Sequence, residues 1–401
     1  MRTLIGIITI ILIIFSSLSG CTLFGSDDES EPGGEIDAFD QEDLSVPKVM
    51  DIGQFQQDVT KPTSDNSGEE VPFKYQTTWA FSYNTVYVDF GGVMQLWLSN
   101  LGENEMYIYE FGISSEWLAD NLTAECGKQI LPGEEVEIGY IAFPGPPSPG
   151  NYEYQLIFGV MARESELVAW YDWGIVGNRT YTLEITSLSS SSELQDYTTE
   201  HNSEGLYTKI NDLIDPMQKD IRDKAVDIAK KYEGPYNIFQ LCEIFQFVKT
   251  EISYVNDPRG DDNYWSTPEE TLTLCAGDCE DQATLFAAMI SAIDGTARIY
   301  ITDSHAFASV YIGDSDTTRI DILKAINSYY NTELKFAWLE DDLGFWLVID
   351  TINAMHPGGL PLGSEPLESD EQNDSDGNSQ DNLTWPWDFN DTTTLIIIDV
   401  T

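Results

Sequence analysis

Basic residues are scarce in this chain. Its 401 residues include 19 Lys and Arg against 69 Asp and Glu, which gives a net charge of -50 at pH 7. A surface of this sign repels the phosphate backbone, so we expect no nucleic-acid partner. Strong acidity also keeps a protein soluble, but it indicates no particular chemistry.

Histidine and cysteine are also few, which limits the sites that the chain can build. There are 3 His and 5 Cys. Five cysteines in a chain of this length do not make a disulfide framework. Cys275 and Cys279 are four residues apart, but no paired zinc-ligand spacing accompanies them. We therefore expect no metal site and no cofactor, whereas a free thiol fits this composition.

The N-terminus has the features of an export segment. Arg2 precedes an apolar run, Leu4–Phe15, and small residues lead to Cys21. The sequence Leu18-Ser-Gly-Cys21 resembles a lipobox, where a prokaryotic signal peptide is cut and the new N-terminal cysteine is lipidated. The alternative is an uncleaved helical anchor, because the apolar stretch can be extended through Phe24 to nearly the length that spans a membrane. Both interpretations place the remainder on the outer side of the cell membrane.

Hydrophobic content of 42% and this length predict two folded units with linkers. Residues 1–20 are the signal, and residues 21–71 form an acidic tether. Residues 72–187 alternate apolar and polar side chains between turns, as in an all-β immunoglobulin-like sandwich that acts as a spacer or binding module. Residues 188–205 are a linker to a second domain at 206–363. The clearest predicted strands of the sandwich are Val93–Leu98, Met106–Phe111, Val136–Ile141 and Tyr152–Phe158.

The second domain is predicted to be α+β. Its first helix starts with Asp215 as N-cap and Pro216 in the first turn, and Met217 begins its apolar stripe. Further helices are expected at 237–250 and 279–293, strands at 297–302, 306–312 and 345–351, and an insertion at 313–344. Residues 364–401 are an acidic linker with one terminal strand, Thr392–Asp399, which the sequence leaves unplaced.

Cys279 is the candidate nucleophile, because it lies at the start of a predicted helix. Unsatisfied N–H groups and the helix dipole stabilise a thiolate there. The acidic neighbours Asp278, Glu280 and Asp281 would cap the same helix end and would oppose ionisation of the thiol. A cationic partner is therefore needed, and His305 is the histidine of the predicted core.

A third group should fix the tautomer of the imidazole. Asp350 ends a predicted apolar strand beside that of His305 and is the preferred candidate. Asp321 and Asn353 are the alternatives, but neither follows an apolar strand in this way.

Several runs together resemble the transglutaminase-like superfamily of papain-fold thiol enzymes, in the form of archaeal or bacterial surface lipoproteins with an N-terminal β-sandwich. The resemblance implies a papain-like α+β core with a Cys–His–Asp triad, carried over by motif to Cys279, His305 and Asp350. Two departures are Phe307, where the family usually has Trp, and Thr351, where it usually has Pro. A third is the insertion between His305 and Asp350. The runs that carry the resemblance are Phe247–Tyr254, Trp265–Leu272, Gly277–Ala283, His305–Phe307 and Trp346–Thr351.

The expected function is that of an exported, membrane-tethered thiol enzyme that catalyses acyl transfer on a protein or peptide substrate, with hydrolysis favoured. A cross-linking transglutaminase is one alternative, and a non-catalytic surface-binding module that retains the fold is another. Cys275 would either form a regulatory bond with Cys279 or simply pack.

Overall fold

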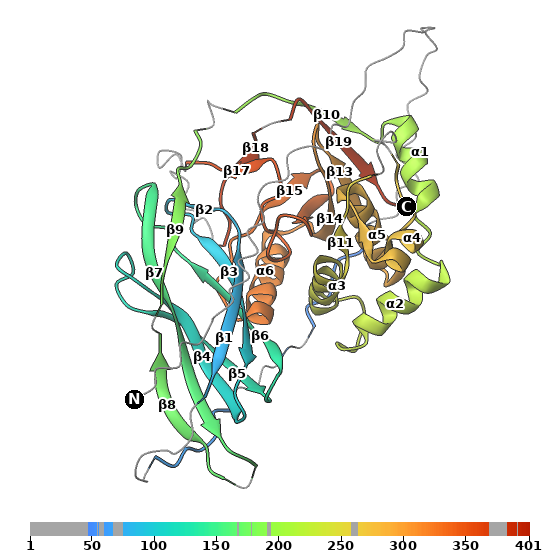
Figure 1. Ribbon diagram of the computed structural model, residues 1–401. Helices are drawn as coiled ribbons and strands as arrows, with labels where there is room; N and C mark the ends of the chain where they lie inside the picture. The colour runs from blue at the N-terminus through green and yellow to red at the C-terminus, as the bar shows by residue number, and fades with distance from the viewer. Residues whose placement is uncertain are drawn as a thin grey trace, which may run out of the picture. The chain divides into compact units, whose positions relative to one another are not determined.

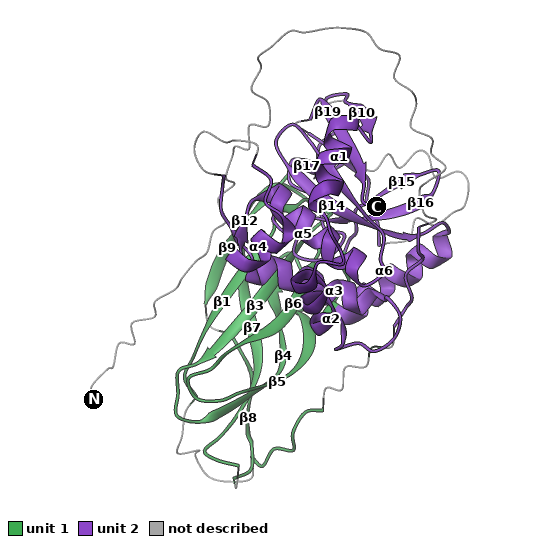
Figure 2. Cartoon of the chain, turned by 90° about the vertical axis from the view of Figure 1, so that its right-hand side faces the viewer, with its two compact units in different colours: residues 1–18, 55–188, 330–334 green, residues 19–54, 189–329, 335–401 purple. Residues whose placement is uncertain are grey.

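The computed structural model describes residues 47–53, 55, 60–66, 75–166, 168–177, 179–190, 194–257, 264–368, 383–390 and 392–401. Figure 1 shows the path of the chain, and Figure 2 colours its two compact units. Cys21 and the rest of the expected signal and anchor lie outside the described residues. Among the helices that the structure describes, none is long and apolar enough to cross a membrane.

Unit 1 contains the described residues within 55–188 and 330–334 and is built from sheets whose strand pairs are antiparallel, except for the parallel pair of β2 and β9. One sheet has the order β1-β3-β6, and the other has the order β2-β9-β7-β4-β5 with β8 paired to β7. All four strands that the sequence predicts most clearly are present, within β3, β4, β6 and β7. The strands are β1 Thr77–Tyr83, β2 Val86–Tyr87, β3 Gly92–Asn100, β4 Glu105–Ser115, β5 Leu122–Ile130, β6 Glu135–Phe143, β7 Gly150–Arg163, β8 Tyr171–Val176 and β9 Thr180–Thr186.

Alternation of side chains between two faces builds the core of unit 1. Met94, Leu96 and Leu98 on β3 are fully buried at every second position, and Ile108 on β4 and Leu156 on β7 lie in the same cluster. This period of two is what a sheet with one core-facing side requires.

Unit 2 contains those described residues that lie within 47–53, 189–329 and 335–401. Its main sheet has the order β10-β19-β13-β14-β16-β15, with β10 and β19 parallel and the other pairs antiparallel. The strands are β10 Thr198–His201, β11 Ser253–Tyr254, β12 Ala276–Gly277, β13 Ala297–Ile301, β14 Ala306–Gly313, β15 Trp338–Asp341, β16 Gly344–Ile349, β17 Ser364–Pro366, β18 Trp387–Phe389 and β19 Thr394–Asp399. The helices are α1 Glu204–Leu213, α2 Lys219–Ala229, α3 Ile238–Glu251, α4 Pro268–Leu274, α5 Cys279–Ala292 and α6 Asp316–Tyr330.

Helix α5 is the buried centre of unit 2. Leu285, Met289 and Ile290, the expected inward face, are fully buried, as are most other residues of this helix. It packs against β13, β14, α2, α3 and α4. A helix that is apolar all round belongs inside a core, so the N-terminal end of α5 is held by neighbours on several sides.

The fold class expected from the sequence is confirmed: a β-rich N-terminal region precedes an α+β domain. The expected start of the first helix is wrong. Asp215 accepts a hydrogen bond from the Met217 amide, and the side chain of Gln218 caps α2 instead. Met217, predicted in the apolar stripe, is 70% exposed.

Unit 2 is also wider than the predicted 206–363. Strand β10 lies within the expected linker at 188–205, and β19 is the terminal strand that the sequence leaves unplaced. Residues 47–53, within the expected tether, also belong to this unit, and Asp51 bridges to Asn237 while Met50 is buried.

Candidate active site

The two strands β14 and β16 bring His305 and Asp350 together. His305 immediately precedes β14, Asp350 immediately follows β16, and the strands are antiparallel neighbours with Ala308 opposite Ile349. The start of one strand therefore meets the end of the other. Nε2 of His305 lies 2.9 Å from Oδ2 of Asp350, and both side chains are buried.

The carboxylate of Asp350 is held by backbone amides as well as by the imidazole. Oδ1 accepts hydrogen bonds from the amides of Ile352 and Asn353, and Oδ2 accepts one from Leu362. Burial favours the neutral acid, but the His305 ring and these amides favour the carboxylate more, so the pKa of Asp350 lies below its ordinary value. Asp350 is thus held as an anion that fixes the ring of His305.

The two alternative residues lie elsewhere. Asp321 is exposed on α6. The side-chain amide of Asn353 donates to the carbonyl of Leu360, while its backbone amide supports Asp350. Of these three candidates, Asp350 is therefore the one that the structure places against His305.

Cys279 is the first residue of α5 and shares a small cavity with Asp350. The cavity is too tight to hold a water molecule and is also lined by Gln282, Phe307 and Thr351. Cys279 is 2% exposed and His305 is 1% exposed, so this end of α5 is nearly closed to solvent. A substrate chain needs a movement of the lining residues before it can reach the sulfur.

The two departures from the family motif both lie in this region. Phe307 stacks on Tyr300 at 5.2 Å between ring centroids and lies 6.2 Å from the His305 ring, nearly parallel to it. The hydroxyl of Thr351 donates to Oε1 of Gln282 at 2.9 Å, and both residues are buried. This bond ties the end of β16 to the first turn of α5, where Cys279 lies.

The acidic residues around Cys279 behave differently from one another. Asp281 accepts hydrogen bonds from the amide and the hydroxyl of Ser266, and so fixes the segment before α4. Asp278 occupies the N-cap of α5, but its side chain makes no capping hydrogen bond, contrary to the expectation. The thiol of Cys279 donates to Oε2 of Glu280 at 3.1 Å.

Asp278 and Glu280 form a crowded pair of carboxyl groups. Burial, and next the charge of Glu280, raise the pKa of Asp278 to about 9. A proton is therefore retained on this pair at neutral pH, which lessens the repulsion of a thiolate at Cys279. The sequence alone could not show that a proton is retained, because both carboxyl groups are expected to be charged at neutral pH unless they are known to be buried.

Two further basic side chains of unit 2, Lys249 and His356, have lowered pKa values. Burial lowers the pKa of Lys249 to about 8, and the charge of Asp350 opposes that shift. Burial also lowers the pKa of His356 to about 4 although its Nδ1 bonds the Pro357 carbonyl. The sequence analysis singled out neither residue, although Lys249 lies within the run Phe247–Tyr254.

The remaining cysteines differ from Cys279 in their surroundings. Cys126 and Cys242 are buried among apolar side chains, and burial raises the pKa of Cys126 to about 12 and that of Cys242 well above its ordinary value. Cys275 is exposed in a left-handed conformation at the end of α4. Neither Cys275 nor Cys279 is in a disulfide, so the bond considered between them is not formed.

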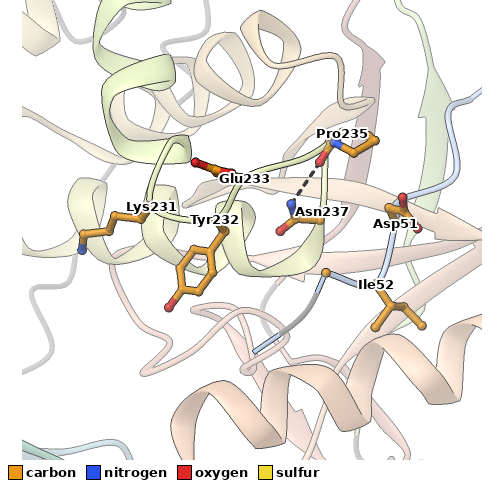
Figure 3. Close-up of a pocket in the computed structure, with 8 residues that line it drawn as sticks. Asp51, Ile52, Lys231, Tyr232, Glu233, Pro235 and Asn237 are labelled. Carbon is orange, nitrogen blue, oxygen red and sulfur yellow. Dashed lines mark hydrogen bonds between the residues drawn. The ribbon is translucent and has the colours of Figure 1, made fainter. Parts of the chain in front are cut away.

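A larger pocket lies elsewhere in unit 2, between residues 51–53 and the connection from α2 to α3 (Figure 3). It is lined by Lys231, Tyr232, Glu233 and Asn237, and the Asn237 side chain donates to the Pro235 carbonyl. Its described lining provides an ammonium group, two carboxyl groups, a phenol and an amide, which are binding groups. Cys279 and Asp350 do not line this pocket; they line the smaller cavity at α5.

The comparison with protein families agrees with this arrangement. Residues 222–340 match the family model described as the transglutaminase-like superfamily. This chain contains a transglutaminase-like domain. Cys279 and His305 lie within the matched residues, whereas Asp350 lies beyond them.

Solved structures resemble the chain only weakly. One is a candidate cysteine protease from Cytophaga hutchinsonii, with 12% identity and a TM-score of 0.23 over 71% of this chain and 83% of that one. Another is a candidate protease from Parabacteroides distasonis, with 10% identity and a TM-score of 0.21 over 59% of this chain and 64% of that one. A search of the curated proteins finds no match. The transglutaminase-like domain is thus identified by its sequence match.

Proposed function

We propose that the transglutaminase-like domain is a thiol enzyme that catalyses acyl transfer, with hydrolysis of a peptide or amide as its reaction. The observation that supports this most strongly is the hydrogen bond between His305 and Asp350 beside the buried start of α5. Asp350 holds Nε2, which leaves Nδ1 of the ring to exchange a proton with the thiol. Cys279 is then the nucleophile, His305 the general base and acid, and Asp350 the orienting group.

The reaction has two steps. The Cys279 sulfur attacks the acyl carbon while His305 accepts the thiol proton, and the ring then donates that proton to the departing amine. Water attacks the resulting thioester, His305 accepts its proton, and the thiol is restored as the acid leaves. An amine in place of water would make the protein a cross-linking transferase, which is the second candidate.

We also propose that the protein is exported and tethered to the outer side of the membrane through Cys21. This rests on the lipobox-like sequence Leu18-Ser-Gly-Cys21. Cys21→Ala should release the protein from the membrane or leave its precursor uncut. A variant that stays in the membrane fraction at the size of the wild type would instead support an uncleaved helical anchor.

Thiol labelling followed by peptide profiling tests the catalytic proposal. Near neutral pH, iodoacetamide should modify Cys279 faster than Cys126, Cys242 or Cys275, and a library of labelled peptides should be cleaved. Cys279→Ala should abolish cleavage, and His305→Ala should slow it by about 10²- to 10⁴-fold. If Cys279 labels no faster than the others and neither change matters, the domain is a non-catalytic binding module.

A further inference from the structure

Three consecutive residues at the start of α5 direct ligand-type atoms to one place. A carboxylate oxygen of Asp278, Sγ of Cys279 and a carboxylate oxygen of Glu280 all lie within 4.8 Å of one another. Each of the three side chains is 2% exposed. Acidic residues are common on the surface of this protein, but a buried group of two carboxyls and a thiol is a different feature.

Asp278 has a side-chain oxygen that lacks, within the part of the chain that is described, the hydrogen-bond partner that a buried carboxyl group normally has. Although it is the N-cap residue of α5, its side chain does not turn back to bond the amides of the first turn. Among the described residues, its Oδ1 is buried and has no hydrogen-bond partner. Leaving a buried polar atom unpaired costs about 1–3 kcal/mol and more for a charged group, so such an atom points to a partner that the chain itself does not supply.

We propose that Asp278, Cys279 and Glu280 form a binding site for a thiophilic divalent cation of the Zn²⁺ class. A thiolate with two carboxylates is a donor set that Zn²⁺ accepts, and three protein ligands leave a fourth position for water. Ca²⁺ and Mg²⁺ prefer oxygen ligands alone and do not select a thiolate. The sequence argument against zinc considered paired cysteines and histidines, and so did not weigh carboxylates next to the cysteine.

Binding exchanges protons for the metal without any redox change. The thiol proton, which points to Glu280 in this structure, leaves to solvent, and a metal–sulfur bond forms in its place. Any proton shared by the two carboxyl groups leaves in the same way. The cation then occupies the sulfur lone pair that would attack an acyl carbon, so the bound form is inactive. This consequence rests on the proposed function, whereas the binding itself does not.

The rival explanation is that the two carboxyl groups merely share one proton. Binding of Cd²⁺ to the full-length protein separates the two, because a Cd²⁺–thiolate bond absorbs in the ultraviolet. Cys21 and the exposed Cys275 are changed to Ser so that they cannot contribute. We expect one equivalent of Cd²⁺ to bind, Zn²⁺ to displace it and Ca²⁺ to leave it in place. Cys279→Ala should remove the absorption.

Isosteric variants identify the carboxylate ligands. Glu280→Gln and Asp278→Asn should each weaken Cd²⁺ and Zn²⁺ binding by at least about 10- to 100-fold, since loss even of an outer partner has that effect. Glu269→Gln makes the same charge change at an exposed position of α4 and should leave the affinity unchanged. Circular dichroism confirms that each variant is folded.

The outcomes are distinct. No saturable Cd²⁺ absorption, or an affinity that neither variant lowers, would overturn the metal site and leave the shared proton as the explanation. If binding follows the prediction but no peptide is cleaved with or without zinc, the metal site stands and the proposed hydrolysis fails. If cleavage occurs and zinc inhibits it only where Glu280 and Asp278 are intact, both proposals are supported.

Discussion

Nε2 of His305 lies 2.9 Å from Oδ2 of Asp350, although 45 residues separate the two in the sequence. The insertion between them contributes α6 and β15, and leaves β14 and β16 paired directly. A long insertion is compatible with the site because both residues sit at adjoining ends of neighbouring strands. Their contact is therefore a property of the sheet.

Asp350→Asn should separate orientation from binding. Without the carboxylate, His305 loses its fixed tautomer, and kcat should fall by roughly 10²- to 10⁴-fold. Asparagine keeps only one acceptor oxygen, so the amides of Ile352, Asn353 and Leu362 cannot all remain paired, and stability should fall by about 1–3 kcal/mol. Steady-state kinetics and thermal unfolding measure the two effects.

The pH dependence of that stability follows from the lowered pKa of Asp350. A carboxyl whose folded pKa lies below its unfolded value of 3.8 stabilises the fold above pH 3.8, and this contribution is lost as pH falls through the folded pKa. The wild type should therefore lose more stability in acid than Asp350→Asn does. Asp321→Asn, on the exposed face of α6, is the matched control. Equal acid sensitivity of the wild type and Asp350→Asn would contradict this role.

Thr351→Val should weaken catalysis without removing any catalytic group. Valine has the shape of threonine but cannot donate to Oε1 of Gln282, so a buried acceptor is left unpaired at about 1–3 kcal/mol. The end of β16 is then no longer tied to α5, and a misplacement of about 1 Å can lower kcat by about 10²-fold. KM should change little. Thr351→Ser keeps the hydroxyl donor and should have nearly the wild-type rate. If Thr351→Ser is as slow as Thr351→Val, the hydrogen bond to Gln282 does not position the site.

The sequence predicts the elements of the site better than it predicts the limits of the domain. Helix α5 and strands β13, β14 and β16 are near the expected positions because long apolar runs mark them. Strand β10, with the sequence Thr-Thr-Glu-His, has no such pattern and is defined by pairing with β19, almost 200 residues away. Pairing at this distance leaves no local signal.

The hydrogen-bond partners of individual polar side chains also could not be predicted from the sequence. Asp278 has the residue type and position of a helix cap, yet its side chain makes no capping bond. The neighbouring acids differ in their roles: Asp281 bonds Ser266, whereas Asp278 retains a proton. These roles depend on how deeply each carboxyl group is buried, and that burial depends on the packing around α5.

Asp278→Asn should stabilise the metal-free protein, and increasingly so as the pH rises. The pKa of Asp278 is raised from 3.8 to about 9, first by burial and then by Glu280. Its ionisation therefore opposes folding, and the wild type loses stability as pH rises from about 3.8 to about 9. Asparagine cannot ionise, so the gain in Tm over the wild type should grow across this range and level off above it. Glu269→Gln should show no such trend, and a gain that shrinks with rising pH would refute the raised pKa.

Strand β19 lies inside the sheet of unit 2, between β10 and β13. Leu395 and Ile398 on this strand are buried, and each buried side chain of this kind contributes about 1.5–3 kcal/mol. Asp399, next to them, binds the guanidinium of Arg298, which is 1% exposed and stacks over Trp346 at 3.6 Å. Ending the full chain at residue 390 removes all of these contacts, a loss comparable to the ~5–15 kcal/mol stability of a whole domain. The truncated chain should therefore lose the folding transition of unit 2 in calorimetry, and so should the fragment 206–363.

Asp399→Asn tests the ion pair alone. Removing one partner of a buried pair costs up to about 3–5 kcal/mol, although Arg298 retains Asp341 as a second partner. The pKa of Asp399 is lowered to about 2, because His201 and Arg298 outweigh the effect of burial, so its stabilising contribution is present above pH 3.8 and is lost as pH falls through about 2. The variant should therefore be less stable than the wild type at neutral pH, with a difference that narrows in acid. Asp342→Asn, exposed in the turn between β15 and β16, should change stability by no more than about 0.5 kcal/mol. A truncated chain that keeps the unit 2 transition would show that β19 is an accessory strand and that residues 206–363 suffice.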